Sequence, residues 1–238
     1  MKKLTIGWYV PDDDQRVTFL LAKDTQMSRP KYEEKYREII VRQLPNKRTF
    51  VDVGANVGIW SLPMFKYFKN VVPYEPSKQN IECLKLNIPP SIKIRELAVA
   101  DFNGEADFHQ AGKNCGDGKL VGDLPIPSSY KVPVVKLDDE NLSNVDMVKI
   151  DTQGWELQVL KGMTGILKNQ RPWVMIEINE EVDICCKLME KYDYEMVYVK
   201  SKRNLLWAPK TGHNSPLDKS ILKRYLGPGP YAPRYAPG

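Results

Sequence analysis

The stretch TFVDVGANVG, at residues 49–58, decides the fold. Its first half is a short, mainly apolar run typical of a buried strand, and its glycines allow a tight turn into the helix that we expect next. Main-chain N–H groups at such a helix start can contact a ligand, and Asp52 could reach a cationic ligand group. The alternative is a plain strand–helix turn that needs glycine only for its geometry. The spacing matches neither GxGxxG nor a GKS/GKT loop, which disfavours phosphate-binding loops and a nicotinamide dehydrogenase.

Outward from this turn, the pattern of strand, turn and helix repeats. Strands alternating with helices predict an α/β fold, with a mainly parallel sheet and right-handed crossovers. The predicted strands are 70–76, 91–99, 104–110, 130–137, 145–151, 172–179, 194–200 and 204–209. The predicted helices are 59–68, 77–88, 154–169 and 180–192. Two prolines conflict with this pattern, because Pro63 lies inside a helix and Pro73 inside an expected inner strand.

The ends of the chain differ from this central domain, which we place at residues 46–210. Residues 1–45 predict an N-terminal extension: a hairpin of strands 4–10 and 16–22, then a helix between Pro30 and Pro45. Residues 211–238 form a Pro-rich basic tail, which we expect to be dispensable for folding from residue 212 onward.

Composition and charge limit the class of protein. The 238 residues are 42% hydrophobic and 27% charged, which excludes a disordered, collagen-like or coiled-coil chain. We expect no membrane insertion and no signal peptide, because no apolar run is long enough for either. The four cysteines form no CxxC pair, so we expect a reducing, cytoplasmic location and no metal site. The net charge is +5, and residues 199–238 alone carry +7, which could attract nucleic acid or simply solubilise that end.

Acidic residues follow several predicted strands. Glu75 ends the second strand of the central domain, 21 residues after Gly54, where a carboxylate could accept hydrogen bonds from ribose hydroxyls. Asp151 and Glu177 end two later strands, where a carboxylate could steer a hydroxyl, act as a base or hold a metal. Asp151 could instead cap the next helix. His109 is a further base candidate, although a lone histidine at a strand end is more often structural.

Two other features bear on the site. Residues 111–129 read as a loop without regular structure, which we interpret as a cover over the substrate. Trp155 and Trp173 follow apolar patterns and are expected to serve packing.

Taken in order, DVGANVG, YEPS, KLDD, VDMVKIDTQGWELQVLKGM and PWVMIEI resemble the FkbM family of S-adenosylmethionine-dependent methyltransferases. The resemblance covers about residues 30–210. It implies a class I methyltransferase fold, Rossmann-like, with a seven-stranded, mostly parallel sheet and helices on both faces. It also implies O-methylation of a sugar, glycan or small-metabolite hydroxyl. Carried over to this chain, it assigns the cofactor loop to Asp52, Gly54, Ala55, Asn56 and Gly58, the ribose contact to Glu75, and the signature after the later strand to Asp151, Gly154 and Glu156.

One departure and two alternatives stand beside this resemblance. The family pattern has Glu where this chain has Gln153, so one negative charge is missing. An RNA ribose methyltransferase would use the basic end, but its usual Lys-Asp-Lys-Glu set lacks a second lysine here. A non-catalytic cofactor-binding protein on the same fold is the other alternative, and the intact Asp52, Gly54, Gly58 and Glu75 argue against it.

Overall fold

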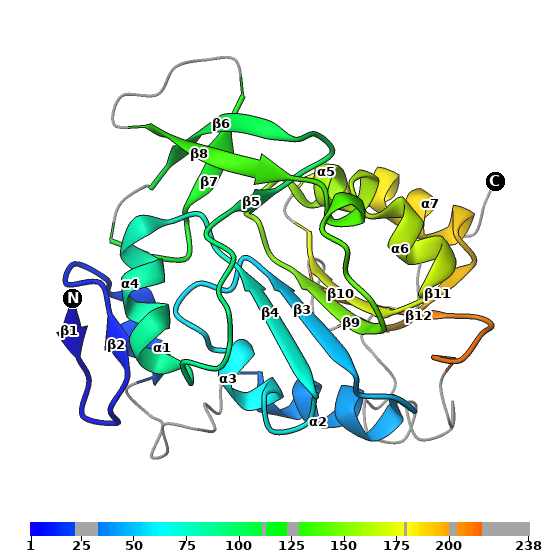
Figure 1. Cartoon of the computed structure of the whole chain (residues 1–238), viewed down its shortest axis with the longest axis horizontal. Coiled ribbons are helices and arrows are strands. Elements are labelled where there is room, and N and C mark those ends of the chain that lie inside the picture. Colours follow the sequence, from blue (N-terminus) through cyan, green and yellow to red (C-terminus); the bar gives the residue numbers. More distant parts are fainter. Residues whose placement is uncertain (22–32, 111–112, 123–128, 179, 200–203, 216–238) are drawn as a thin grey trace.

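The computed structural model describes residues 1–21, 33–110, 113–122, 129–178, 180–199 and 204–215. Within them, a mixed sheet of six strands forms the centre of the molecule (Figure 1). Its spatial order is β11 (Tyr194–Val199), β12 (Asn204–Pro209), β10 (Trp173–Glu177), β9 (Val145–Ile150), β3 (Thr49–Val53) and β4 (Asn70–Tyr74). The four strands from β10 to β4 are parallel. β12 pairs antiparallel with β10, and β11 pairs antiparallel with β12 and so runs in the same direction as the four. The predicted α/β fold with a mostly parallel sheet is therefore confirmed, and among the described residues this sheet has six strands where seven were expected.

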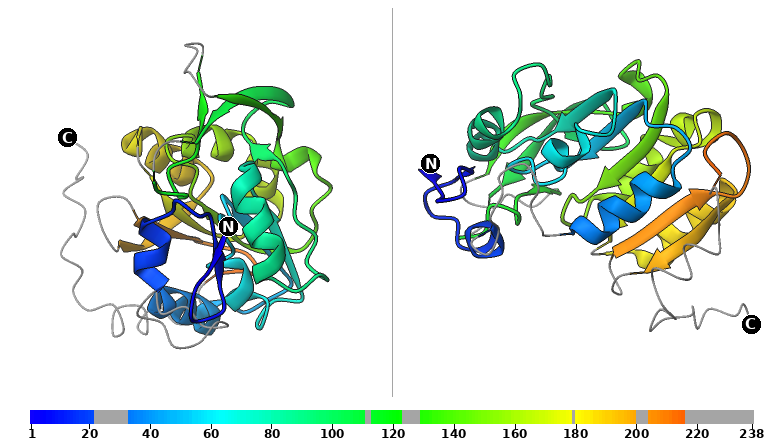
Figure 2. Two further views of the ribbon diagram at one scale, coloured as in Figure 1. Left: turned by 90° about the vertical axis from the view of Figure 1, so that its left-hand side faces the viewer. Right: turned by 90° about the horizontal axis from the view of Figure 1, so that it is seen from below.

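Successive side chains along each strand point to opposite faces of the central sheet, and each face carries its own apolar core. Phe50 is paired with Met147 and faces one core, whereas Val51 is paired with Val148 and faces the other. The first core is covered by α2 (Glu34–Gln43), α3 (Ser61–Met64) and α4 (Lys78–Asn87), which contribute residues to it. The second is covered by α5 (Glu156–Lys161), α6 (Thr164–Asn169) and α7 (Val182–Lys191). Helices thus lie on both faces of the sheet (Figure 2).

A smaller four-stranded sheet lies beside the central one. Its order is β5 (Ala98–Val99), β8 (Tyr130–Val135), β6 (Gly104–His109) and β7 (Lys119–Val121), and a 3₁₀ turn, η1 (Leu137–Asp139), follows β8. Phe108, Leu120 and Val132 belong to a core of its own. β7 corrects the prediction of a structureless segment at 111–129, because it pairs antiparallel with β6. Residues 111–112 and 123–128 lie outside the described part.

The N-terminal hairpin is smaller than predicted. β1 (Lys2–Lys3) pairs with β2 (Tyr9–Val10), but the expected strand at 16–22 is the helix α1 (Arg16–Leu21). The cause is Asp14, whose carboxylate accepts hydrogen bonds from the N–H groups of Val17 and Thr18 and so caps the helix start. The predicted next helix is confirmed as α2, within the described residues from Glu33 onward.

Two predicted helices are shortened or divided. α3 has only four residues, as Pro63 suggested. The single helix expected at 154–169 is two helices, α5 and α6. A Cβ on Gly162, between them, would lie 2.0 Å from the carbonyl oxygen of Ala100, and Asp138 accepts the N–H groups of Gly165 and Ile166 at the start of α6. Close packing and a separate cap therefore end one helix and begin the other.

Pro73 occupies β4 without loss of a ladder bond to β3. Its carbonyl accepts from the Arg95 N–H, and the Glu75 N–H donates to the Arg95 carbonyl, in an isolated parallel bridge. Residues 73 and 75 therefore point their backbone groups away from β3, and the N–H that proline lacks would lie on that outer side.

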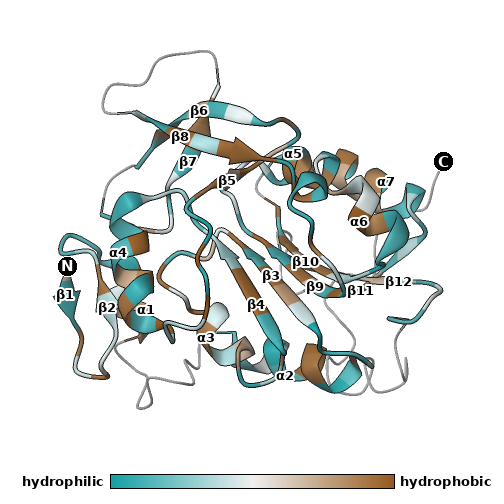
Figure 3. Cartoon of the chain, in the orientation of Figure 1, coloured by the Kyte–Doolittle hydropathy of each residue, from teal (hydrophilic) through white to brown (hydrophobic). Residues whose placement is uncertain are grey.

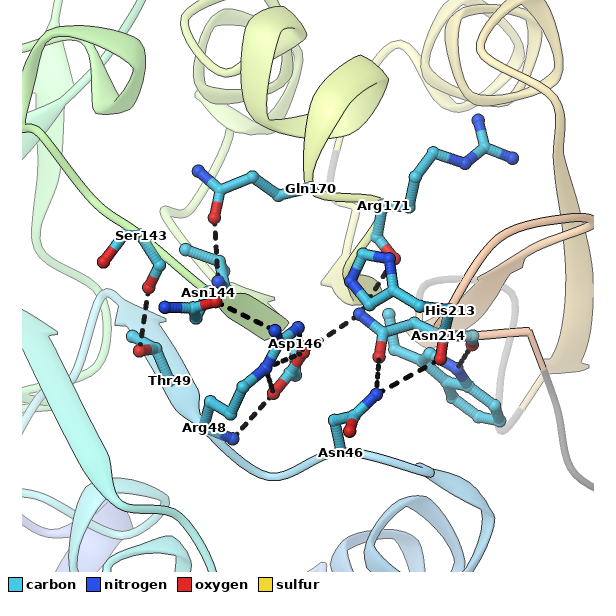
Figure 4. A network of polar contacts seen from close by, with 12 residues as sticks. Asn46, Arg48, Thr49, Ser143, Asn144, Asp146, Gln170, Arg171, His213 and Asn214 are labelled. Atoms are coloured by element: carbon cyan, nitrogen blue, oxygen red, sulfur yellow. Dashed lines mark hydrogen bonds and ion pairs between the residues drawn. The ribbon is translucent and has the colours of Figure 1, made fainter.

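A buried carboxylate forms a hydrogen-bond network at the amino ends of β3 and β9 (Figure 4). Asp146 is fully buried and binds the Arg48 guanidinium and backbone N–H, and Asn214 Nδ2 donates to it at 3.1 Å. Burial alone would raise the pKa of Asp146, but the Arg48 and Asn214 donors lower it overall. The Asn214 carbonyl also accepts from the indole of Trp173 at 2.7 Å. Residue 214, expected in the dispensable tail, is therefore tied to the sheet.

Apolar residues, brown in Figure 3, run along the strands of both sheets, and the helices carry stripes of both colours. Trp173 is fully buried, as predicted for a packing residue. Among the described helices, none combines the length and apolarity that crossing a bilayer requires.

Candidate active site

The site lies where parallel strands end around a change of strand order. β3 is flanked by β4 on one side and by β9, much later in the chain, on the other. In open α/β sheets, the crevice at such a switch point, beyond the carboxyl ends of the strands, is where ligands bind. Gly54, Glu75, Asp151 and Glu177 all lie at or just after these ends.

Gly54 turns the chain away from β3 at a point that admits no side chain. Its φ is +75°, and a Cβ would lie 1.9 Å from the carbonyl oxygen of Asp151. The N–H groups of Gly54 and Ala55 both donate to the Tyr74 carbonyl at 3.0 Å. The start of the loop is thus fixed between β4 and the residue that follows β9.

Glu75 braces the same loop from the end of β4. One carboxylate oxygen accepts the N–H of Asn56 at 2.8 Å, and the other accepts the N–H of Ser77 at 2.9 Å and Asn80 Nδ2 at 3.3 Å. Asn56 has a left-handed φ of 53°, which aims its N–H at the carboxylate. Burial raises the pKa of Glu75 to about 7, although the donors of Ser77 and Asn56 oppose the shift.

Asp52 is a buried partner of a lysine. It is fully buried, accepts from Ser61 Oγ at 2.6 Å, and has its other oxygen 3.5 Å from Lys149 Nζ. Burial raises the pKa of Asp52, and Lys149 and Ser61 oppose that shift. The expected contact of Asp52 with a cationic ligand group is thus replaced by an internal cation.

Lys149 is the residue that sequence reasoning missed. Its ammonium donates to the Gly54 carbonyl at 2.8 Å and lies 3.5 Å from both Asp52 Oδ1 and Asp151 Oδ2. Burial alone would lower the pKa of Lys149, but the carboxylates of Asp151 and Asp52 raise it overall. The available signal was a lysine inside an apolar strand, two residues before Asp151 and so on the same face.

Asp151 is held from two sides and remains accessible. Gln153 Nε2 donates to its Oδ1 at 2.7 Å, Lys149 approaches its Oδ2, and 26% of its side chain is exposed. The carboxylate that accepts the N–H groups of this turn is instead that of Glu156, bonded to Thr152 and Gly154. These contacts disfavour the helix-cap alternative for Asp151.

Two clefts meet at Asp151. The first cleft has about 560 Å³ of empty space, including its open mouth, and the second about 860 Å³. Residues around the carboxyl ends of strands, from α4 and from the small sheet line the first cleft: Gly54, Tyr74, Glu75, Asn80, Leu120 and Trp155. Residues that are far apart in the sequence line the second cleft: Arg16, Glu33, Trp60, Lys149, Gln153 and Glu177. Asn56, Gly116 and Asp151 line both.

The other predicted site residues lie as follows. Ala55 and Glu177 line the second cleft. Gly58 lines neither cleft, and a Cβ there would lie 2.9 Å from Leu84 Cδ1, so it allows the loop to pack against α4. His109 also lines neither cleft, and its buried Nδ1 has no hydrogen-bond partner among the described residues.

The segment interpreted as a substrate cover does contribute to both clefts in its described part. Gly116 lies between the two, and Gly118 and Leu120 line the first. The Trp155 indole donates to the Leu120 carbonyl at 2.9 Å, so this tryptophan forms part of the cleft wall as well as the packing of the small sheet.

A second element that the sequence did not place is α1. It brings Arg16, Val17 and Leu20 to the second cleft. Asp14 holds it there, because its carboxylate also accepts the N–H of Cys115 at 3.1 Å. These contacts lie about a hundred residues apart in sequence, which no local pattern reveals. For metals, no group of three His, Cys, Asp or Glu side chains with a suitable arrangement exists in the part of the chain described.

Two curated proteins resemble the chain in sequence. Hexuronic acid methyltransferase AglP of Haloferax volcanii is 28% identical over 138 residues, which cover 56% of this chain and 56% of that protein. Methyltransferase sdnD of Sordaria araneosa is 23% identical over 175 residues, 54% of this chain and 67% of that protein. The chain thus spans little more than half the length of the first relative.

A solved structure, methyltransferase FkbM from Methylobacillus flagellatus KT, has the same fold. It aligns with a TM-score of 0.51 at 16% identity, over 68% of this chain and 43% of that chain. The sequence model of the methyltransferase FkbM domain matches residues 52–196, from the strand end before the glycine loop to β11. The chain therefore belongs to the FkbM methyltransferase domain family.

Proposed function

We propose that the protein transfers a methyl group from S-adenosylmethionine to a hydroxyl of a sugar, a glycan or a small metabolite. The observation that carries the proposal is the pair of clefts that share Asn56, Gly116 and Asp151. One cleft would take the cofactor and the other the acceptor, with transfer where they meet. The relative from Haloferax volcanii, named for a hexuronic acid, supports a sugar as the acceptor.

The first cleft offers hydrogen-bond acceptors suited to the cofactor. A carboxylate has about four acceptor positions, and chain donors take three of those on Glu75, so one is left for a ribose hydroxyl. Asn80 Oδ1 is buried, lines this cleft and has no hydrogen-bond partner among the described residues. An unpartnered buried acceptor is costly unless a ligand donor reaches it.

Methyl transfer requires that the acceptor hydroxyl be positioned and that a base take its proton. When bound, the cofactor supplies a methyl group already activated on a sulfonium. Holding the acceptor hydroxyl close to that methyl accounts for much of the acceleration, since effective molarities reach ~10⁵–10⁸ M. Asp151 would accept the hydroxyl proton, Gln153 and Lys149 would hold its carboxylate in place, and Glu177 would contact the acceptor in the second cleft.

Cofactor affinity gives the first test. Removing one charged hydrogen-bond partner costs about 1.5–3 kcal/mol, so Glu75→Ala should weaken binding of S-adenosylmethionine and its demethylated product about tenfold or more. Glu82→Ala, at an exposed position of α4, is the matched control and should bind as the unmodified protein does. Calorimetry that finds no cofactor binding by the unmodified chain would refute the proposal. Equal affinity in the Glu75 variant would remove only Glu75 from the site.

Transfer itself is tested with labelled cofactor. The protein is incubated with separate fractions of glycans, RNA and small metabolites, and the fraction that gains label is identified. Label in the glycan or metabolite fraction supports the proposal, and label in RNA alone would favour the ribose-methylating alternative. Cofactor binding with no label in any fraction would favour the non-catalytic alternative.

A further inference from the structure

Among the described residues that line the second cleft, Arg16 is a charged residue without a polar partner. It lies on α1, its side chain is exposed, and it makes no hydrogen bond or ion pair with any residue that the structure describes. Lys149, the other cation there, is taken up by the Gly54 carbonyl and two carboxylates.

The carboxylates of this cleft all have interactions within the chain. Glu33 accepts from the Trp60 indole at 2.7 Å, and Asp117 accepts from Asn114 Nδ2 at 2.6 Å. Asp151 is held by Gln153, and Glu177 also has a polar interaction. Such carboxylates retain lone pairs for hydroxyl groups, because each oxygen can accept more than one hydrogen bond.

The position of Arg16 is fixed by the fold. Asp14 is 1% exposed, and its carboxylate accepts N–H groups from both α1 and Cys115, while the Gln15 N–H donates to the Lys113 carbonyl at 2.8 Å. Two links therefore join the start of α1 to the segment that lines both clefts. Arg16 thus lines the second cleft from a helix whose start is anchored.

We propose that Arg16 selects an acceptor that is a sugar acid, a polyhydroxylated ring with one carboxylate. The inference rests on the proposed function and names its substrate class. The hydroxyls would meet the carboxylates of the cleft, and the single negative charge would meet Arg16, whose fork of donors matches a carboxylate. One unmatched cation among several carboxylates suits one negative charge and disfavours a polyanion.

The test measures acceptor binding without requiring turnover. Protein saturated with S-adenosylhomocysteine is mixed with glucuronate, galacturonate, glucose or galactose, and binding is followed by saturation-transfer NMR. The uronates should bind more tightly than the neutral sugars, and Arg16→Gln should weaken them about tenfold or more, as expected for a charged hydrogen-bond pair. Arg16→Lys should retain part of the affinity, because the charge stays but the bidentate geometry is lost.

Lys93→Gln, at an exposed position that lines neither cleft, is the control for loss of one positive charge and should leave uronate binding unchanged. The melting temperature of each variant checks its folding. Equal binding of uronates and neutral sugars, unchanged uronate binding by the Arg16→Gln variant, or no uronate signal from cofactor-saturated protein would each overturn the inference. Calorimetry on the same sample separates these results from a failure of the proposed function, which would appear as loss of cofactor binding.

Discussion

Gln153 donates from its side-chain amide to Oδ1 of Asp151 across 2.7 Å, from a backbone with a left-handed φ of 56°. The residue that departs from the family pattern is thus a neutral donor to the candidate catalytic carboxylate. A glutamate here would place a second negative charge beside Asp151. Where the family pattern has a negatively charged glutamate, this chain has a neutral amide. That amide donates a hydrogen bond that holds the Asp151 carboxylate at the junction of the clefts.

Asp151→Asn should impair methyl transfer more than folding or cofactor binding. The amide keeps the size of the side chain but cannot take a proton, so turnover should fall about 10²-fold or more, the low end for a lost general base. Labelled-methyl transfer to the acceptor found in the fractionation gives the rate, and calorimetry should show cofactor affinity within a few-fold. An Asn variant with full activity would move the base to Glu177.

Gly54→Ala should severely destabilise the protein. The new Cβ would lie 1.9 Å from the Asp151 carbonyl oxygen, at a φ of +75°. This oxygen belongs to the backbone, so it cannot move aside as the end of a flexible side chain could. We expect a loss of about 3 kcal/mol or more in the free energy of unfolding, measured by denaturant titration. Gly122→Ala is the control, since nothing lies within 4 Å of its Cβ position, and it should change stability little. Similar stabilities for the two variants would contradict the described geometry.

Glu75 should make stability fall as pH rises toward neutrality. Its pKa is raised from the ordinary 4.5 to about 7, so between these values the folded state holds a proton that the unfolded state has lost. Folding is then favoured by this group below about pH 4.5, and that contribution is lost as pH rises through about 7. The difference in unfolding free energy between the unmodified protein and Glu75→Gln should change by up to about 3 kcal/mol across this window. A difference that stays constant with pH would show that Glu75 titrates normally.

Truncation should show that the folded domain extends beyond Gly212 to include Asn214. Asn214 is fully buried and bonds to Asp146 and Trp173, so a chain ending at Gly212 leaves the Trp173 indole without its acceptor and removes one donor from Asp146. That chain should melt several degrees lower, whereas one ending at Ser215 should melt close to the full chain. Asn214→Ala in the full chain keeps the backbone carbonyl that accepts from Trp173, so it should reproduce only the part of the loss that comes from the side-chain bond to Asp146. Equal melting temperatures for the two truncations would restore the boundary expected from the sequence.

Local patterns predicted most of the fold correctly. The strands at 49–53 and 145–150 and the helix at 78–87 follow from apolar periodicity and from breakers at their ends. One error arises from a local helix cap and another from a contact distant in sequence. Residues 16–21 are helical because Asp14 caps them, and the helix at 154–169 divides because Gly162 packs on the Ala100 backbone.

The candidate site also has parts that the sequence predicts and parts that it does not. Glu75 and Asp151 were predictable, since each follows a strand at the carboxyl edge of a parallel sheet. The internal pairing of Asp52 was not, because it depends on the strand register that places Lys149 beside it. Arg16 was invisible for a different reason: its place in the second cleft depends on the hydrogen bond from Cys115 to Asp14.

The outer side of β4 has a consequence for self-association. Exposed sheet edges are templates on which a second molecule can add a strand, a route to aggregation. Here the Pro73 carbonyl and the Glu75 N–H already pair with Arg95, and proline offers no N–H of its own. An incoming strand would find neither a free donor nor a free acceptor at these positions, so the proline that conflicted with an inner strand protects this edge against intermolecular pairing.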